Sequence, residues 1–148
     1  MRLLDIVTTA CISLLIGTEL TVSVFINPIL WKLENSTQMI AVRLFAQRLG
    51  TAMPFWYAAS LILLIAETTV RRHEANIVLL MVATIIWAAV IVLTVVYLVP
   101  INSRLAQMGA NSVAVVTQQQ HRHWDTMHRY RVAALGLSML CFLVATVS

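Results

Sequence analysis

The feature that most constrains the fold of this chain is residues 77–99, a run of 23 residues without a charged side chain. At a rise of about 1.5 Å per residue, a helix of this length crosses the roughly 30 Å hydrocarbon layer of a bilayer. Backbone inside that layer must pair its own N–H and C=O groups, which a helix does within itself. The run therefore predicts a membrane-spanning helix.

Three further apolar runs predict additional spans. Residues 49–66 and 132–148 carry no charged side chain, and residues 6–31 carry only Glu19. The composition, 60% hydrophobic and 11% charged, agrees with a chain that lies mostly in lipid. We predict an all-α fold, a four-helix transmembrane bundle in one domain, with spans at about residues 6–31, 49–66, 77–99 and 128–148.

The connectors between these spans differ in length. Residues 67–76 are short and polar, so spans two and three are expected to be antiparallel neighbours with Glu67 at the surface. The connectors after spans one and three are longer, share one side of the membrane and are expected to be amphipathic. In residues 34–50, apolar side chains share a helical face, which is typical of a helix lying in the membrane interface. Gly50 and Pro54 then predict a break before span two.

Glu19 is the most unusual residue of the first span. A carboxylate inside a membrane helix costs a few kcal/mol, so such residues usually face the bundle and have a partner. Glu19, Ser23 and Asn27 are four residues apart and form one polar row, which we expect to face inward. Two interpretations are open: a protonated Glu19 that hydrogen-bonds to a neighbouring helix as packing, or a ligand, proton-handling or substrate-binding role.

Titratable side chains gather in residues 121–131, HRHWDTMHRYR, which hold three of the four histidines of the chain. His121, Asp125 and His128 follow at i, i+4 and i+7, so they share one helical face. Their donor atoms suit copper, iron or zinc, with Glu19 as a further ligand. His128 oriented by Asp125 is also a candidate catalytic base. The competing interpretation is a polar collar at the membrane surface whose arginines pair with lipid phosphates.

Aromatic and amide side chains near the ends of the predicted spans are candidates for binding a hydrophobic small molecule. Arg131 joins them as a partner for Asp125, for Glu19 or for an anionic substrate. The candidates are Asn27, Trp31, Trp56, Asn102, Trp124 and Arg131. Structural explanations compete here as well, because tryptophan gathers at membrane interfaces and asparagine satisfies a carbonyl freed by a nearby proline.

The composition disfavours several classes of function. The formal charge of +4 comes without a dense basic tract, so we expect anionic lipid headgroups and no nucleic acid as partners. The chain has no nucleophile motif and no glycine-rich phosphate-binding loop. One intramembrane acid without a second polar rung does not make an ion path. A homo-oligomer is compatible with the sequence.

Four stretches of the chain resemble a family of small four-helix membrane proteins that includes the fungal anthrone oxygenases. The stretches are GTELTVSVFINPILWKL, MPFWYA, VPINSRL and HRHWDTMHRYRV. The resemblance implies a four-helix transmembrane bundle, oxidation of anthrones to anthraquinones with molecular oxygen, and a histidine near the last span in the chemistry. The residues that match the motifs are Asn27, Pro28, Pro100, Asn102, Trp124, Asp125, His128 and Arg131.

Glu19 resembles the bacterial branch of the family and not the fungal one, which implies a bacterial inner membrane and bears on the substrate. The first hypothesis is an oxidoreductase that acts on a hydrophobic aromatic substrate through a His, Asp and Glu site at one membrane face. The second is a non-enzymatic membrane protein that binds a lipid, a quinone or a partner subunit through the same cluster. A tightly bound redox metal would favour the first.

Overall fold

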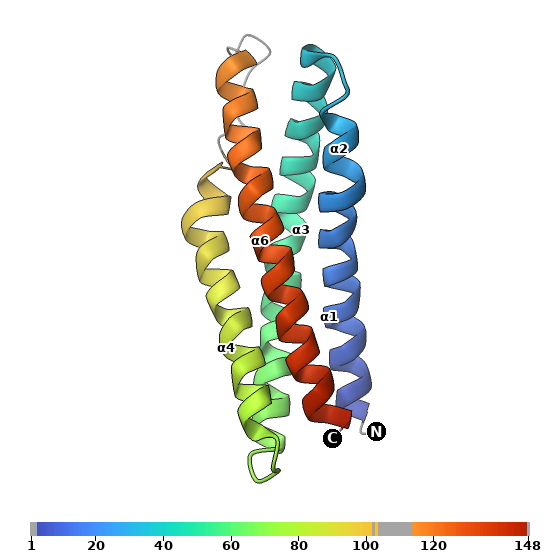
Figure 1. Cartoon of the computed structure of the whole chain (residues 1–148), viewed down its shortest axis with the longest axis vertical. Coiled ribbons are helices and arrows are strands. Elements are labelled where there is room, and N and C mark those ends of the chain that lie inside the picture. The colour runs from blue at the N-terminus through green and yellow to red at the C-terminus, as the bar shows by residue number, and fades with distance from the viewer. Residues whose placement is uncertain (1–2, 102, 104–113, 148) are drawn as a thin grey trace.

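The computed structural model describes residues 3–101, 103 and 114–147, and these form a four-helix bundle with both chain ends at one end (Figure 1). The first helical segment consists of α1, a π-helical turn (η1) and a short helix (α2). The third segment consists of α4 and a second π-helical turn (η2). The elements are α1 (Leu3–Thr21), η1 (Val22–Ile26), α2 (Asn27–Leu30), α3 (Asn35–Val70), α4 (Ile77–Leu93), η2 (Thr94–Leu98) and α6 (Ala114–Val147). The predicted all-α four-helix fold is confirmed.

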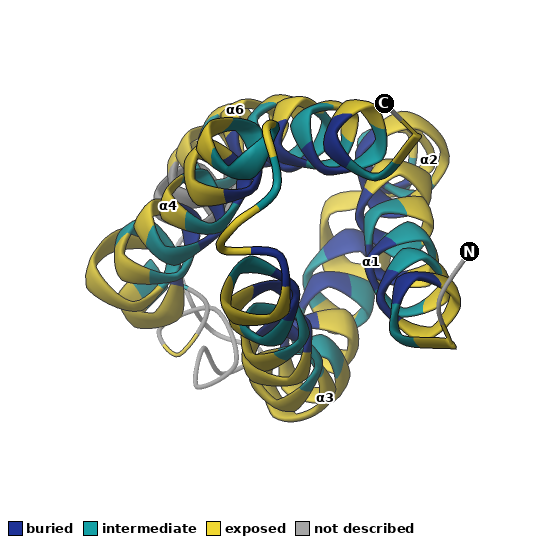
Figure 2. Ribbon diagram, turned by 90° about the horizontal axis from the view of Figure 1, so that it is seen from below, coloured by how far each residue is buried: buried dark blue, intermediate teal, exposed yellow. Residues whose placement is uncertain are grey.

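Each of the four helical segments is long and apolar enough to cross a membrane. The segments are Leu3–Leu30, Asn35–Val70, Ile77–Ile101 and Arg122–Val147. Large apolar side chains such as Phe55 and Ile62 point outward, with 78% and 66% of their surface exposed. Buried residues face the centre of the bundle and exposed ones face away (Figure 2). Such a surface suits lipid and would aggregate in water, so the chain is a multi-pass integral membrane protein.

The half of the bundle toward the chain ends is built around an apolar core. Leu15, Leu64, Trp87 and Phe142 have almost no exposed surface and pack together there. α4 and α6 approach closely, and the Ser138 hydroxyl donates a hydrogen bond of 2.8 Å to the Ala83 carbonyl oxygen across this contact. This closely packed half supports a more polar half toward the other end.

Both π-helical turns directly precede a proline motif. The backbone N–H of Asn27 bonds to the carbonyl of Val22, and that of Val99 bonds to the carbonyl of Thr94, each five residues back. Proline at the next position has no N–H, and its ring crowds the carbonyl four residues back. A wider turn relieves that crowding, so the two prolines explain where the helices widen.

α3 differs from the predicted break between a connector and span two. Residues 34–50 do not form a separate helix in the interface, because α3 runs unbroken for 36 residues through Gly50 and Pro54. The Pro54 ring meets the carbonyl of Gly50, whose backbone adapts more readily than that of other residues. Leu30 and Val42 pack in a second, smaller core that holds the first half of α3 upright against α2.

The prediction that Glu67 lies at the surface is wrong, because its side chain is fully buried. The Arg71 guanidinium lies between three carboxylates, with nitrogen to oxygen distances of 2.7 Å to Asp5, 3.3 Å to Glu67 and 2.9 Å to Glu74. The hydrogen bond to Asp5 raises the pKa of Arg71, which keeps the guanidinium charged. This group, the Arg71 clamp, joins the start of α1 to the end of α3.

Candidate functional site

A pocket of about 260 Å³ lies beyond the apolar core, between all four helical segments. Most of its wall is apolar and comes from α3 and the third segment, including Met53, Pro54, Val95 and Leu98. Both π-helical turns contribute residues to the wall of the pocket. Such turns often occur at functional sites in proteins. The titratable side chains in the lining are Glu19, Tyr57, His128 and Arg131.

Glu19 is the centre of this polar group, and both of its carboxylate oxygens have partners. Oε1 accepts a hydrogen bond of 2.9 Å from the Tyr57 hydroxyl. Oε2 accepts one of 2.5 Å from Arg131 Nη2 and lies 3.3 Å from His128 Nδ1. Only 3% of Glu19 is exposed, so the carboxylate exchanges water for these three partners. The group Glu19, Tyr57, His128 and Arg131 is called the Glu19 network below.

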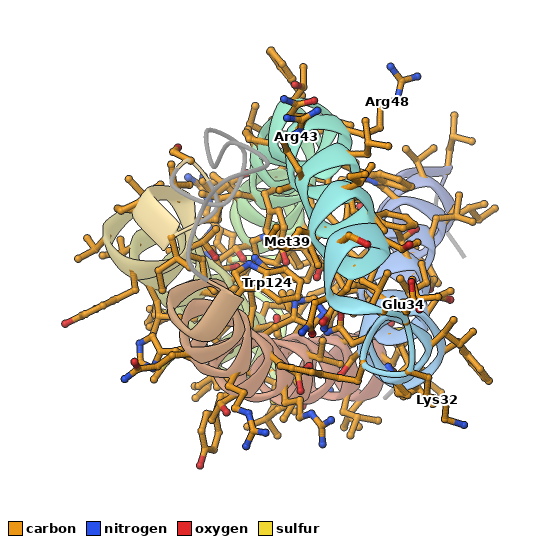
Figure 3. All side chains as sticks on the ribbon, turned by 90° about the horizontal axis from the view of Figure 1, so that it is seen from above. Lys32, Glu34, Met39, Arg43, Arg48 and Trp124 are labelled. Atoms are coloured by element: carbon orange, nitrogen blue, oxygen red, sulfur yellow. The ribbon has the colours of Figure 1, made fainter. Side chains whose placement is uncertain are left out.

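His128 is held on three sides and is 1% exposed. Its Nε2 lies 3.1 Å from the backbone carbonyl oxygen of Glu19, and its Nδ1 lies 2.8 Å from Arg131 Nη2. A neutral ring with its proton on Nε2 satisfies both contacts, because Nε2–H donates and Nδ1 accepts from Arg131. The ring stacks on Trp124 at 4.7 Å with an interplanar angle of 10°. Trp124 points to the interior, while Lys32 points outward (Figure 3).

Arg131 neutralises the Glu19 carboxylate and contacts a ring of the pocket wall. Its guanidinium carbon lies 5.6 Å from the centre of the Tyr57 ring, within the range of a cation–π contact. A buried carboxylate alone would be costly, and a directly bonded guanidinium offsets that cost. Among the described residues, Arg131 Nε has no hydrogen-bond partner although it is buried.

Asp125 is buried but does not line the pocket, and its partners differ from those predicted. Its Oδ1 accepts a hydrogen bond of 2.7 Å from Asn27 Nδ2, and its Oδ2 lies 3.1 Å from Arg129 Nη2. In the described structure, the carboxylate that contacts His128 is Glu19 and not Asp125. Asn27 and Asp125 thus join the first segment to α6 next to the pocket.

The predicted inward row of Glu19, Ser23 and Asn27 is confirmed, because all three side chains are buried. Glu19 lies in α1, Ser23 in η1 and Asn27 at the start of α2. Glu19 and Asn27 each bond to α6. The spacing in the sequence therefore located the polar face of this helix correctly.

Two of the predicted substrate-binding tryptophans lie outside the pocket lining. Trp31 has its ring 5.5 Å from the Arg122 guanidinium carbon. Trp56 donates a hydrogen bond of 3.1 Å from Nε1 to the backbone carbonyl of Cys11. Both therefore connect helices. Asn102 lies outside the described residues.

The predicted metal ligands do not come together in the described part of the chain. Asp125 bonds to the first segment, while Glu19 and His128 meet around Arg131, so the cation beside this carboxylate is a guanidinium. Within the described residues, no three His, Cys, Asp or Glu side chains form a group that can hold a metal ion. The side chain of His121 lies outside this description. The described donors do not fit copper, iron or zinc.

Tyr57 is the site residue that the sequence analysis missed. From the aromatic motif MPFWYA, Trp56 was predicted to bind substrate. Tyr57 is the next residue, and adjacent residues of a helix point about 100° apart, so the two side chains lie on different faces of α3. The buried face of α3 carries Tyr57, Ser60, Leu64 and Glu67, at spacings of three and four residues. This periodicity, with polar members inside an apolar run, was the available signal.

Comparison with known families bears directly on this site. A family model described as anthrone oxygenase matches residues 40–141, more than half of the chain. The chain belongs to the anthrone oxygenase family. No curated protein and no solved structure matches it. Within this anthrone oxygenase family member, the matched range contains Tyr57, His128 and Arg131, whereas Glu19 precedes it.

Proposed function

We propose that this protein is a bacterial inner-membrane oxidoreductase that oxidises an enolisable aromatic ketone, such as an anthrone, with molecular oxygen. The observation that carries the proposal is a buried network of proton acceptors and donors, the Glu19 network, at the wall of an otherwise apolar pocket. The pocket volume of about 260 Å³ suits a compact, flat molecule. Family membership supports the class of reaction.

The reaction needs a base and then dioxygen. Loss of a proton from the methylene carbon of an anthrone gives an enolate, because the electron pair enters the ring system and reaches the carbonyl oxygen. Dioxygen then oxidises this carbon, one oxygen atom becomes the second carbonyl and the other leaves as water. One anthrone and one dioxygen thus give one anthraquinone and one water, and the protein is required only for the proton transfer and for binding.

Each member of the Glu19 network has a role in this proposal. Arg131 turns an N–H group from His128 Nδ1 to the ketone oxygen, which frees Nδ1 to accept the methylene proton. The imidazolium that forms stays beside the Glu19 carboxylate, now 3.3 Å away. The Tyr57 hydroxyl, turned from Glu19 Oε1, and the Arg131 guanidinium then donate to the negative charge that develops on the ketone oxygen. Glu19 takes the orienting role that the sequence assigned to Asp125.

The test is aerobic oxidation of anthrone by the purified protein in lipid nanodiscs, followed as anthraquinone formed and oxygen consumed above the spontaneous rate. We expect a one-to-one ratio of the two, and a loss of about 100-fold or more in turnover for His128→Asn. The matched control is His123→Asn, because His123 lies exposed on the same helix. Equal turnover in wild type and His128→Asn would refute the proposal and leave the network a binding or packing role.

A further inference from the structure

The pocket has a mouth, and the exposure of its lining residues shows where it is. The exposed lining residues all belong to α3 and the third segment. They are Gly50, Pro54, Ala58, Val95 and Val99. The lining residues of the first segment and of α6, which include the Glu19 network members on those helices, are buried or half-buried. The pocket therefore opens sideways, between two helices.

The packing of the helices agrees with this direction. α3 packs against α4, but the third segment leans away from α3 toward its C-terminal end, where η2 contacts α6 (Figure 1). Ala58 on α3 and Val95 on η2 both line the pocket and are exposed, and the side chain of Ala58 is small. These two residues define what we call the lateral portal.

The lateral portal faces hydrocarbon and not water. Val95 lies within residues 77–99, the uncharged run, four residues and thus about 6 Å from its end. The exposed lining residues carry no polar side-chain atoms. The portal thus lies near the edge of the hydrocarbon layer, the level at which aromatic rings with one polar group concentrate.

We propose that the pocket is loaded from the bilayer through the lateral portal by a neutral aromatic molecule dissolved in the lipid. The inference deepens the proposed function and rests on it for the identity of the ligand as substrate. The ligand is neutral because Glu19 and Arg131 already compensate each other, and a charged molecule would have to cross an apolar mouth.

The portal is tested with an iodophenyl diazirine, a neutral aromatic photoprobe, added to phosphatidylcholine vesicles that contain the full-length protein. A light flash at increasing delays converts the probe, with loss of nitrogen gas, to a carbene that inserts into neighbouring bonds. Mass spectrometry then gives the rate at which pocket residues Met53 and Tyr57 are labelled. The outward residues Phe55 and Ile62, exposed to lipid, report that the probe has reached the bilayer.

The portal variant combines Ala58→Leu with Val95→Phe, and we expect it to slow labelling of Met53 and Tyr57 at least fivefold. The matched control combines Ala59→Leu with Val96→Phe, at neighbouring positions that are exposed but do not line the pocket. The pair is closely matched, since Val95 is 58% and Val96 57% exposed. The control variant is expected to behave like the wild type.

Two results would overturn the portal: no labelling of pocket residues from the bilayer, or equal labelling rates in the wild type, the portal variant and the control. The experiment needs no turnover, so it is independent of the oxidation assay. Oxidation of anthrone at equal rates in both variants would contradict the portal alone. Portal-dependent labelling without any oxidation of anthrone would instead contradict the proposed function alone.

Discussion

At the scale of single residues, Glu19 and His128 meet although 109 positions separate them in the chain. Their contact follows from the topology, because the first and last of four spans run antiparallel. Residues of increasing number along the first segment therefore lie beside residues of decreasing number along α6. Glu19 thus lies level with His128 and Arg131, and Asn27 lies level with Asp125. The helical face of Asp125 was predicted from its spacing, but its level along the bundle required the register of the two helices.

Glu19→Gln tests the charge balance of the network. The variant leaves the Arg131 guanidinium, 9% exposed, without its counterion. Loss of one partner of a buried pair costs about 3–5 kcal/mol, so we expect a fall of that size in the free energy of unfolding in mixed micelles. The double variant Glu19→Gln, Arg131→Leu removes both charges and is expected to regain most of the loss. A double variant no more stable than Glu19→Gln would contradict the pairing.

Tyr57→Phe tests the residue that the sequence analysis missed. The variant keeps the ring against Arg131 but removes the hydroxyl that donates to Glu19. We expect about 10-fold slower oxidation of anthrone and a loss of about 1 kcal/mol in unfolding free energy. Tyr130→Phe is the control, since Tyr130 is 68% exposed on α6. Unchanged turnover in Tyr57→Phe would remove the hydroxyl from the mechanism.

At the scale of elements, long apolar runs predicted all four helices, whereas local signals misjudged one of them. Gly50 and Pro54 are helix breakers on average, but packing of Val42 against Leu30 holds both halves of α3 in line. The π-helical turns were not predicted either. The proline motifs mark them, but the sequence does not tell whether a helix ends or widens before a proline.

Pro100→Ala tests the reason for the second π-helical turn. Alanine restores an N–H at this position and removes the ring that crowds the carbonyl of Val96. We expect η2 to tighten toward an α-helix and the bundle to unfold at a higher concentration of denaturing detergent. Anthrone oxidation is expected to slow severalfold, because η2 forms part of the pocket wall. Higher stability with unchanged turnover would show that the width of η2 does not shape the pocket.

At the scale of the whole molecule, the bundle places two polar groups at different levels with an apolar core between them. The Glu19 network lines the pocket, and the Arg71 clamp closes the end where the chain begins. Periodicity gave the polar face of the first helix correctly. Glu67 was predicted at the surface because it was assigned to the short polar connector, whereas it lies on the buried face of α3. The two groups are expected to serve different purposes, chemistry and stability.

Arg71→Gln tests this division. The variant leaves buried carboxylates of Asp5 and Glu67 without their cation, so we expect a loss of about 3–5 kcal/mol in unfolding free energy. Anthrone oxidation per folded molecule is expected to stay within twofold of the wild type, since the Arg71 clamp does not line the pocket. A large fall in turnover at full folding would show that the two ends are coupled.

The most direct test of the central claim, that the Glu19 network takes a proton from a ketone in the pocket, is anaerobic hydrogen exchange. Anthrone is incubated in heavy water with protein in vesicles, without oxygen, and deuterium in its methylene group is measured by mass spectrometry. We predict exchange well above that in empty vesicles, reduced about 100-fold in His128→Asn and retained in His123→Asn. Exchange no faster than in empty vesicles, with folded protein, would contradict the account.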